Sequence, residues 1–159
     1  MKERQFYQNI RKVLDDLPDN FSILEEQIDI EVQMKYFERA QKVRSKIDAT
    51  ECFENREELF TPETTAARKK EILLSIAVLD DVKAFRTIEK FVGVAEGELK
   101  QWAVLAFQES RMLIQSSLLD EQLVFISTGL GGKGQKLRYY VVFINKNQEE
   151  ILKPSQQKF

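Results

Sequence analysis

Histidine is absent from this sequence of 159 residues, and its absence limits the chemistry open to the chain. Histidine is the side chain that most often acts as a general base near neutral pH, and it is the commonest metal ligand. Without it, Ser-His and Cys-His nucleophile pairs are excluded. The carboxylates show no arrangement typical of catalysis. We therefore expect a protein that is not an enzyme, with no catalytic, cofactor-binding or metal-binding residues.

Cysteine, glycine and proline are scarce. Cys52 is the only cysteine, so neither an intrachain disulfide nor a multi-cysteine metal site can form. Six glycines and three prolines force few turns, which favours long helices over many short strands. No apolar run is long enough for a signal peptide or approaches the roughly 20 residues of a membrane span. We expect a cytoplasmic protein that binds no membrane.

Apolar residues recur at helical spacing through most of the chain, which predicts a mainly α-helical single domain over residues 1–159. Ser22 with Glu25 indicates a capping box that opens a helix, and Thr61-Pro62-Glu63 indicates another helix start. The N-terminal helices should occupy residues 1–61. The helices are predicted at 2–17, 22–48, 62–79, 82–92 and 98–118, with a short helix or ordered loop over 49–61.

The pattern changes after Leu118. Two runs rich in β-branched and aromatic residues, 123–127 and 137–144, flank a cluster of glycines. They predict a C-terminal β-hairpin within 119–153, followed by a polar tail, 154–159. The second run is apolar on both faces, and a two-stranded ribbon has unpaired edges. We therefore expect the hairpin to be covered, either by the segment near Ile151 or by another chain.

The glycine cluster, Gly129 to Gly134, formally matches the Gly-x-Gly-x-x-Gly pattern of dinucleotide-binding folds. A predicted strand follows it where those folds need a helix, so a dinucleotide site is not expected. The cluster is a simple turn, a ligand loop or a loop held by a protein partner. Residues 122–148 carry a charge of +4 and no acidic residue. Basic and aromatic residues together could bind RNA through phosphate contacts and stacking, or the lysines could only keep the loop solvated.

This C-terminal segment supplies the candidate partner-binding residues. They are Gly131, Gly132, Lys133, Lys136, Arg138, Tyr140 and Val142.

Residues 62–118 contain a repeated helical pattern. Residues 68–81 carry Lys69 and Ala77 where the second helix of a HEAT repeat has an arginine and a small residue. Residues 82–88 continue the pattern, and 99–107 repeat its Val-Arg-x-x-Ala-x-x-Ala-Leu order. This part of the chain therefore resembles the HEAT family of helical repeats. The resemblance implies an α-α superhelix, or antiparallel helical bundle, that binds partners through an extended surface.

These observations favour a non-enzymatic protein-interaction or adaptor module of the HEAT-like type. The expected partner is a protein, or a second copy of the chain that associates through the C-terminal hairpin. The alternative is nucleic-acid binding, of RNA in particular, through the basic glycine-rich hairpin. The net charge of −2 gives the chain as a whole no attraction to nucleic acid.

Overall fold

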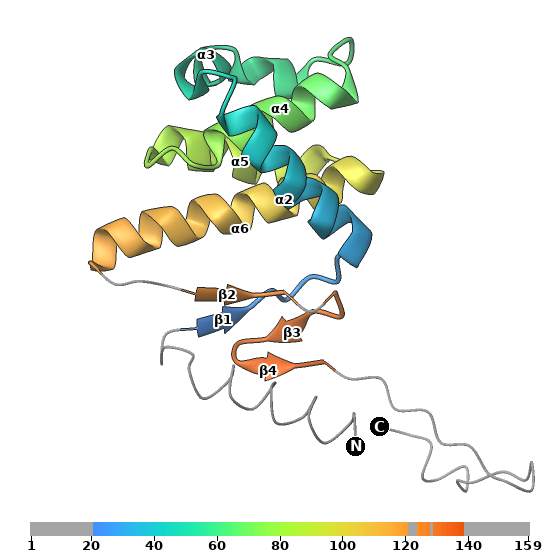
Figure 1. The fold of residues 1–159 in the computed structure, drawn as a ribbon, viewed down its shortest axis with the longest axis vertical. Coiled ribbons are helices and arrows are strands. Elements are labelled where there is room, and N and C mark those ends of the chain that lie inside the picture. Colours follow the sequence, from blue (N-terminus) through green and yellow to red (C-terminus); the bar gives the residue numbers. More distant parts are fainter. Residues whose placement is uncertain (1–20, 121–123, 128, 139–159) are drawn as a thin grey trace, which may run out of the picture.

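The computed structural model describes residues 21–120, 124–127 and 129–138. The chain is mainly helical in these residues, as predicted. The expected helix over 2–17, the tail 154–159 and most of the run 137–144 lie outside the described residues. The helices are α2 (Ile30–Arg44), α3 (Ala49–Glu54), the 3-10 helix η1 (Arg56–Phe60), α4 (Ala66–Ile76), α5 (Val82–Val94) and α6 (Gly97–Leu119) (Figure 1). The strands are β1 (Phe21–Ile23), β2 (Val124–Ile126), β3 (Gly132–Lys133) and β4 (Lys136–Leu137).

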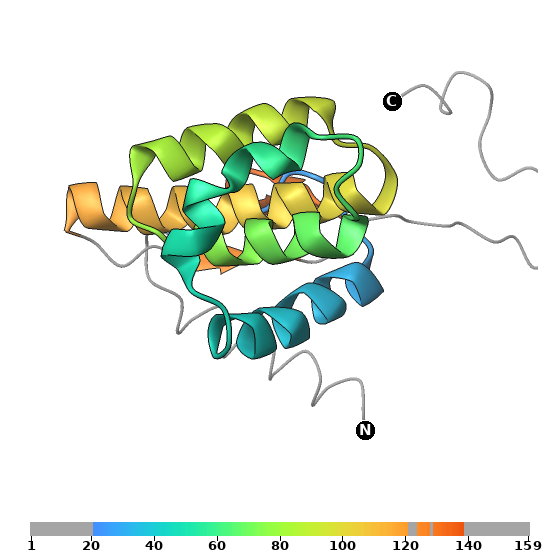
Figure 2. The same cartoon turned by 90° about the horizontal axis from the view of Figure 1, so that it is seen from above.

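The long helix α6 is the centre of the helical layer. Helix α5 packs mainly on α6, α3 packs mainly on α4, and α2 packs on both α4 and α6. Figure 2 shows α2 and α5 on opposite sides of α4 and α6. The hydrophobic core lies where these helices meet, and it includes Trp102, as the helical spacing predicted. Small residues at Ala77, Ala103 and Ala106 are fully buried, which lets the helices approach one another closely.

Two predicted helix starts are wrong, because other residues provide the caps. Helix α2 begins at Ile30 rather than near Ser22, and its cap is Asp29, which accepts a 2.8 Å hydrogen bond from the Glu31 amide. Ser22 lies in β1 instead. Helix α4 begins after Thr65, which accepts a 3.2 Å hydrogen bond from the Arg68 amide.

The end of α4 also differs from the prediction. The helix stops at Ile76 and not at Leu79. Residue Asp81 then caps α5, because its carboxylate accepts hydrogen bonds from the Lys83 and Ala84 amides at 2.6 and 3.1 Å. The predicted helices over 82–92 and 98–118 match α5 and α6 closely.

The strands pair in a way that the sequence does not predict. The predicted strand at Val124–Ile126 exists, but its partner within the described residues is β1, which runs parallel to it with Phe21 opposite Val124. A separate short hairpin begins in the glycine cluster: β3, at the end of the cluster, pairs antiparallel with β4, just after it. The Ile23 amide donates a 3.0 Å hydrogen bond to the Gly134 carbonyl, so the chain at β1 contacts both β2 and this hairpin. Pairing by residues 139–144 stays a prediction, because they lie outside the described residues.

Candidate functional site

Helix α2 has one buried face and two exposed faces, and both exposed faces have a distinct composition. Val32, Tyr36, Ala40 and Val43 form the buried face. With 3.6 residues per turn, the two exposed faces lie about 140° apart around the helix. The first, called the apolar strip below, consists of Ile30, Met34 and Phe37. The second, called the basic stripe, consists of Lys35, Arg39, Lys42 and, in the turn after the helix, Lys46.

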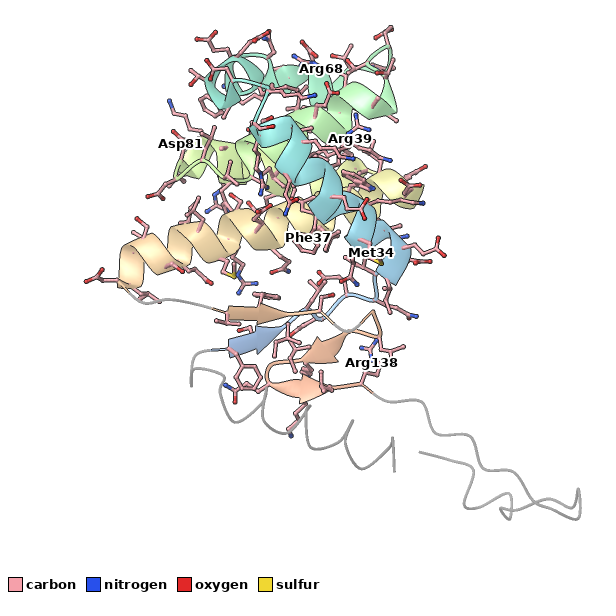
Figure 3. The ribbon with its side chains drawn as sticks, viewed as in Figure 1. Met34, Phe37, Arg39, Arg68, Asp81 and Arg138 are labelled. Carbon is pink, nitrogen blue, oxygen red and sulfur yellow. The ribbon has the colours of Figure 1, made fainter. Side chains whose placement is uncertain are left out.

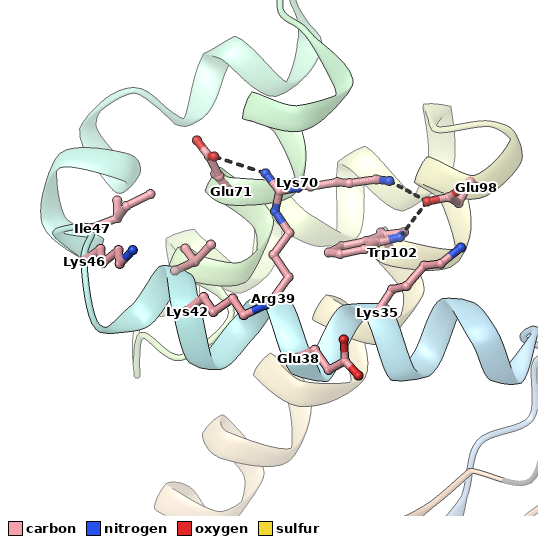
Figure 4. A pocket seen from close by; sticks show the side chains of 11 residues that line it. Lys35, Glu38, Arg39, Lys42, Lys46, Ile47, Lys70, Glu71, Glu98 and Trp102 are labelled. Atoms are coloured by element: carbon pink, nitrogen blue, oxygen red, sulfur yellow. Dashed lines mark hydrogen bonds and ion pairs between the residues drawn. The ribbon is translucent and has the colours of Figure 1, made fainter.

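The basic stripe forms one wall of a cleft between α2, α4 and the first turns of α6 (Figure 4). We call it the α2–α6 cleft; its volume is about 530 Å³. Glu71 and Lys70 reach it from α4, and Glu98 and Trp102 reach it from α6. Its remaining lining residues are Glu38, Val43 and Ile47.

Two of the three carboxylates in the cleft already have cationic partners. The Lys70 ammonium lies 4.5 Å from the centre of the Trp102 ring and forms an ion pair with Glu98. The Trp102 ring N–H also donates a 3.2 Å hydrogen bond to Glu98. The hydrogen bond from Lys70, aided by its charge, lowers the pKa of Glu98. Arg39 pairs with Glu71 at 3.1 Å.

Three cations of the cleft remain without such partners. Lys35, Lys42 and Lys46 form no ion pair with any residue that the structure describes. The third carboxylate, Glu38, forms no ion pair there either. The cleft therefore has an excess of positive charge along one wall, above a floor that includes an aromatic ring.

The apolar strip is exposed although its residues are large and hydrophobic. The exposed fractions of Ile30, Met34 and Phe37 are 60%, 59% and 55%. Figure 3 shows Met34 and Phe37 on the half of α2 nearer the strands. Helical residues at i, i+4 and i+7 lie on one face, so these three side chains form a continuous surface.

A second cavity, of about 330 Å³, adjoins this strip at Phe37. Its walls come from α2, α6 and β2 with the chain before α2, and they include Leu24, Leu105, Met112 and Phe125. The side-chain oxygen of Gln108, which also lines the cavity, is buried and accepts no hydrogen bond from the residues that the structure describes. The cavity is thus mainly apolar and has one unused acceptor in its wall.

The structure separates the site residues predicted from the sequence into two groups. Gly131 and Gly132 are buried; a Cβ on Gly131 would run into the backbone of Glu25, and one on Gly132 would meet Ile23. These two glycines let the loop approach the chain at β1.

The predicted cations lie on the outside of the same loop. Lys133, Lys136 and Arg138 are exposed, and the Arg138 guanidinium donates a 3.4 Å hydrogen bond to the Leu130 carbonyl. Tyr140 and Val142 lie outside the described residues. The structure therefore brings the three cations together at one small hairpin.

Sequence reasoning missed both the apolar strip and the α2–α6 cleft. A signal for the cleft is present, because Lys35, Arg39, Lys42 and Lys46 recur at helical spacing. The apolar strip has helical spacing as well, but spacing alone cannot tell which apolar face the rest of the fold covers.

Within residues 21–120, 124–127 and 129–138, no helix is both long and apolar enough to span a membrane. The same residues contain no group of three or more acidic or cysteine side chains placed to hold a metal ion. Comparisons with protein-family models, curated proteins and solved structures found no match to this chain.

Proposed function

We propose that this chain is a non-enzymatic protein-interaction module, and that the apolar strip with its adjoining cavity binds one amphipathic helix of a partner protein. The observation that carries this proposal is the exposure of Ile30, Met34 and Phe37 on a single face of α2. Large apolar side chains exposed side by side mark interaction surfaces, whereas scattered ones do not. Spacing at i, i+4 and i+7 is the geometry with which helices bind one another.

The size of the apolar strip favours a single helix over a second copy of the chain. Large side chains have about 200 Å² of surface each, so the three exposed portions amount to roughly 350 Å². A stable interface usually buries about 800 Å² on each partner. One amphipathic helix fits the smaller area, since a helix contacts its neighbour along one narrow stripe.

The cavity beside Phe37 supports the same partner. An apolar side chain of the bound helix would enter it and contact Leu105 and Met112. The buried oxygen of Gln108 would accept a hydrogen bond from a donor on that helix, since an unpaired buried acceptor is energetically costly. The cavity thus provides one apolar anchor position for the partner helix, and the Gln108 oxygen requires a hydrogen-bond donor at one position of that helix.

The order in which helices pack is consistent with a HEAT-like module. Helix α3 packs mainly on α4, and α5 packs mainly on α6, so helices that follow one another form pairs. Stacked helix pairs of this kind present extended surfaces for partners. The HEAT-like classification is part of the proposal and rests on this pairing together with the sequence resemblance.

A second candidate function is RNA binding by the β3–β4 hairpin. The observation in its favour is the exposure of Lys133, Lys136 and Arg138 on one small loop. Phosphate contacts would make such binding fall steeply with salt concentration. Replacement of Lys133 and Lys136 by glutamate should abolish the binding of a single-stranded RNA oligonucleotide, measured by fluorescence anisotropy, if this candidate is correct.

The experiment for the main proposal uses a synthetic amphipathic helix with leucines at i, i+4 and i+7, and a second peptide with glutamines at those positions. We expect the leucine peptide to bind the full chain saturably by titration calorimetry. The Met34→Glu, Phe37→Glu double variant should weaken binding by at least about tenfold, because burying a carboxylate in an apolar contact is costly.

The matched control is the Val82→Glu, Val94→Glu double variant, which alters two other exposed apolar residues, 61% and 64% exposed, on α5. It should bind the leucine peptide like the unaltered chain. Equal weakening by both variants, or equal binding of the two peptides, would contradict the proposal. A dimer that dissociates only in the Met34→Glu, Phe37→Glu variant would identify a second copy as the occupant instead.

A further inference from the structure

We infer that the α2–α6 cleft is a second binding site, separate from the apolar strip, and that it takes an acidic peptide segment. The cleft and the strip lie on different faces of α2, so one ligand does not need to displace the other. The charges of the cleft, its length and the hydrogen-bonding groups in its walls determine which ligand it fits.

The charge of the cleft favours a ligand with several carboxylates. Five cations line it, and of these only Lys70 and Arg39 form ion pairs with the carboxylates of the cleft. The other three, Lys35, Lys42 and Lys46, follow one another along α2 and the turn after it. At 1.5 Å per residue, they span about 16 Å. Such a row matches carboxylates along about five residues of an extended peptide, since each residue advances about 3.3 Å.

The walls of the cleft distinguish a peptide from a nucleic acid. Glu38, Glu71 and Glu98 also line it, so a ligand must offer hydrogen-bond donors to carboxylates as well as negative charge to the lysines. A peptide carries backbone N–H groups that donate hydrogen bonds to carboxylates, whereas a phosphodiester linkage has no donor. Glu38 is the natural acceptor for such a donor, because it forms no ion pair within the described residues. An acidic peptide therefore provides carboxylates for the lysines of the cleft and backbone N–H donors for its carboxylates.

The floor of the cleft provides contact area and a direct signal of binding. Val43, Ile47 and the stems of the lysines offer apolar surface to the aliphatic parts of a glutamate-rich segment. Trp102 is the only tryptophan in the chain, and its ring lies against the Lys70 ammonium. A ligand carboxylate would compete with Glu98 for Lys70, so binding should change the fluorescence of Trp102.

The test titrates the full chain with a fluorescein-labelled peptide of alternating glutamate and alanine, and with a peptide that has glutamine at each glutamate position. We expect saturable binding of the acidic peptide, a change in Trp102 fluorescence at the same midpoint, and weaker binding at higher salt. The glutamine peptide should not bind. Equal binding of both peptides would overturn the inference, because the charge of the ligand would then play no part.

Variants locate the site. The Lys42→Glu, Lys46→Glu double variant should reduce affinity for the acidic peptide by at least about tenfold, since like charges now face the ligand. The matched control, Lys83→Glu with Lys90→Glu, makes the same change of charge at another basic cavity, on α5. It should change affinity by less than about twofold, because that cavity is distant from the ligand and screened by salt. If both variants lose the same affinity for the acidic peptide, only the overall charge of the chain matters, and the proposed site is wrong.

Two further arms separate this inference from its competitors. A single-stranded RNA oligonucleotide that binds with the same sensitivity to Lys42→Glu, Lys46→Glu would replace the peptide as the ligand. The Met34→Glu, Phe37→Glu variant should bind the acidic peptide normally, because it leaves the cleft unchanged. If this variant fails to bind the acidic peptide, the peptide binds at the apolar strip, and the cleft is not a second site.

Discussion

The hydroxyl group of Tyr36 donates a 2.7 Å hydrogen bond to the carboxylate of Glu109, and this bond joins α2 to α6. Arg44 donates to the same carboxylate oxygen at 2.6 Å, also from α2. The three side chains hold the middle and the C-terminal end of α2 against one point of α6. Because both exposed faces of α2 depend on this position, the contact supports the apolar strip and the α2–α6 cleft together.

The Tyr36 hydroxyl should make stability depend on pH in the alkaline range. Burial, reinforced by the negative charge of Glu109, raises the pKa of Tyr36 well above its usual value. The folded state thus keeps the proton, while an unfolded tyrosine loses it near pH 10. The stabilisation is present below about pH 10 and is lost as the pH rises further. Urea unfolding between neutral pH and pH 11 should show a steeper loss of stability in the unaltered chain than in Tyr36→Phe.

Tyr36→Phe should also lower the free energy of unfolding at neutral pH, by about 1 to 2 kcal/mol, because a hydrogen bond to a charged group is lost. Glu109 keeps Arg44 as a partner, so the carboxylate is not left unpaired. A pH dependence that is identical in the two proteins would show that Tyr36 does not titrate differently in the folded state. The other tyrosines are common to both proteins and cancel in the comparison.

Lys70→Met should return the pKa of Glu98 toward its usual value. The hydrogen bond and charge of Lys70 lower this pKa, so Glu98 stays ionised to lower pH than an isolated glutamate does. The contribution of the pair to stability is present above the ordinary glutamate pKa and is lost as the pH falls through the lowered one. NMR titration of the Glu98 carboxyl should show an upward shift of the midpoint in Lys70→Met, and Lys83→Met should leave it unchanged.

The caps of α2 give a direct test of where that helix begins. Asp29→Ala should lower the free energy of unfolding by about 1 kcal/mol, because the amide of Glu31 loses its acceptor. Ser22→Ala should change it by less than about 0.5 kcal/mol, since Ser22 is an exposed strand residue. Urea unfolding of both variants measures the difference. A larger effect of Ser22→Ala would restore the helix start that the sequence predicts.

The contrast between Asp29 and Ser22 shows why some elements could be predicted and others could not. Helices α5 and α6 follow local signals: a capping aspartate, apolar spacing and a break just before Gly97, although Gly93 lies within α5. The position of Trp102 in the core follows from the same spacing. Strand β1 has no local signal, because its three residues pair with Val124–Ile126, about a hundred positions away in the sequence. Its formation is what removes Ser22 from the predicted helix.

The candidate sites were harder to predict than the fold. The basic stripe has a visible period, but only packing shows that α4 and α6 turn it into a cleft with Trp102 on its floor. In the apolar strip, Ile30 and Met34 alternate along the sequence with Ile28 and Val32, and this pattern does not show that the first two are exposed while the last two are buried. Exposure depends on which neighbours cover a face, and no property of the segment itself determines that.

The backbone of Gly131 has a φ of +74°. Alanine there is strained in this left-handed conformation, and its Cβ would run into the carbonyl oxygen of Glu25, a backbone atom that cannot move aside. Gly131→Ala should therefore lower the free energy of unfolding by more than about 2 kcal/mol, or detach the loop from the chain at β1. Urea unfolding measures the first effect, and amide exchange at Gly132, which donates to Glu25, measures the second.

The matched control is Gly134→Ala. Gly134 also has a positive φ, +58°, but a Cβ there would meet no atom of the described part of the chain within 4 Å. Gly134→Ala should lower the free energy of unfolding by only about 1 kcal/mol, which is the cost of the left-handed backbone conformation alone. The difference between the two variants isolates the close approach of the loop to Glu25. If both variants lose the same stability, this approach contributes nothing, and the glycine cluster is a turn without a packing role.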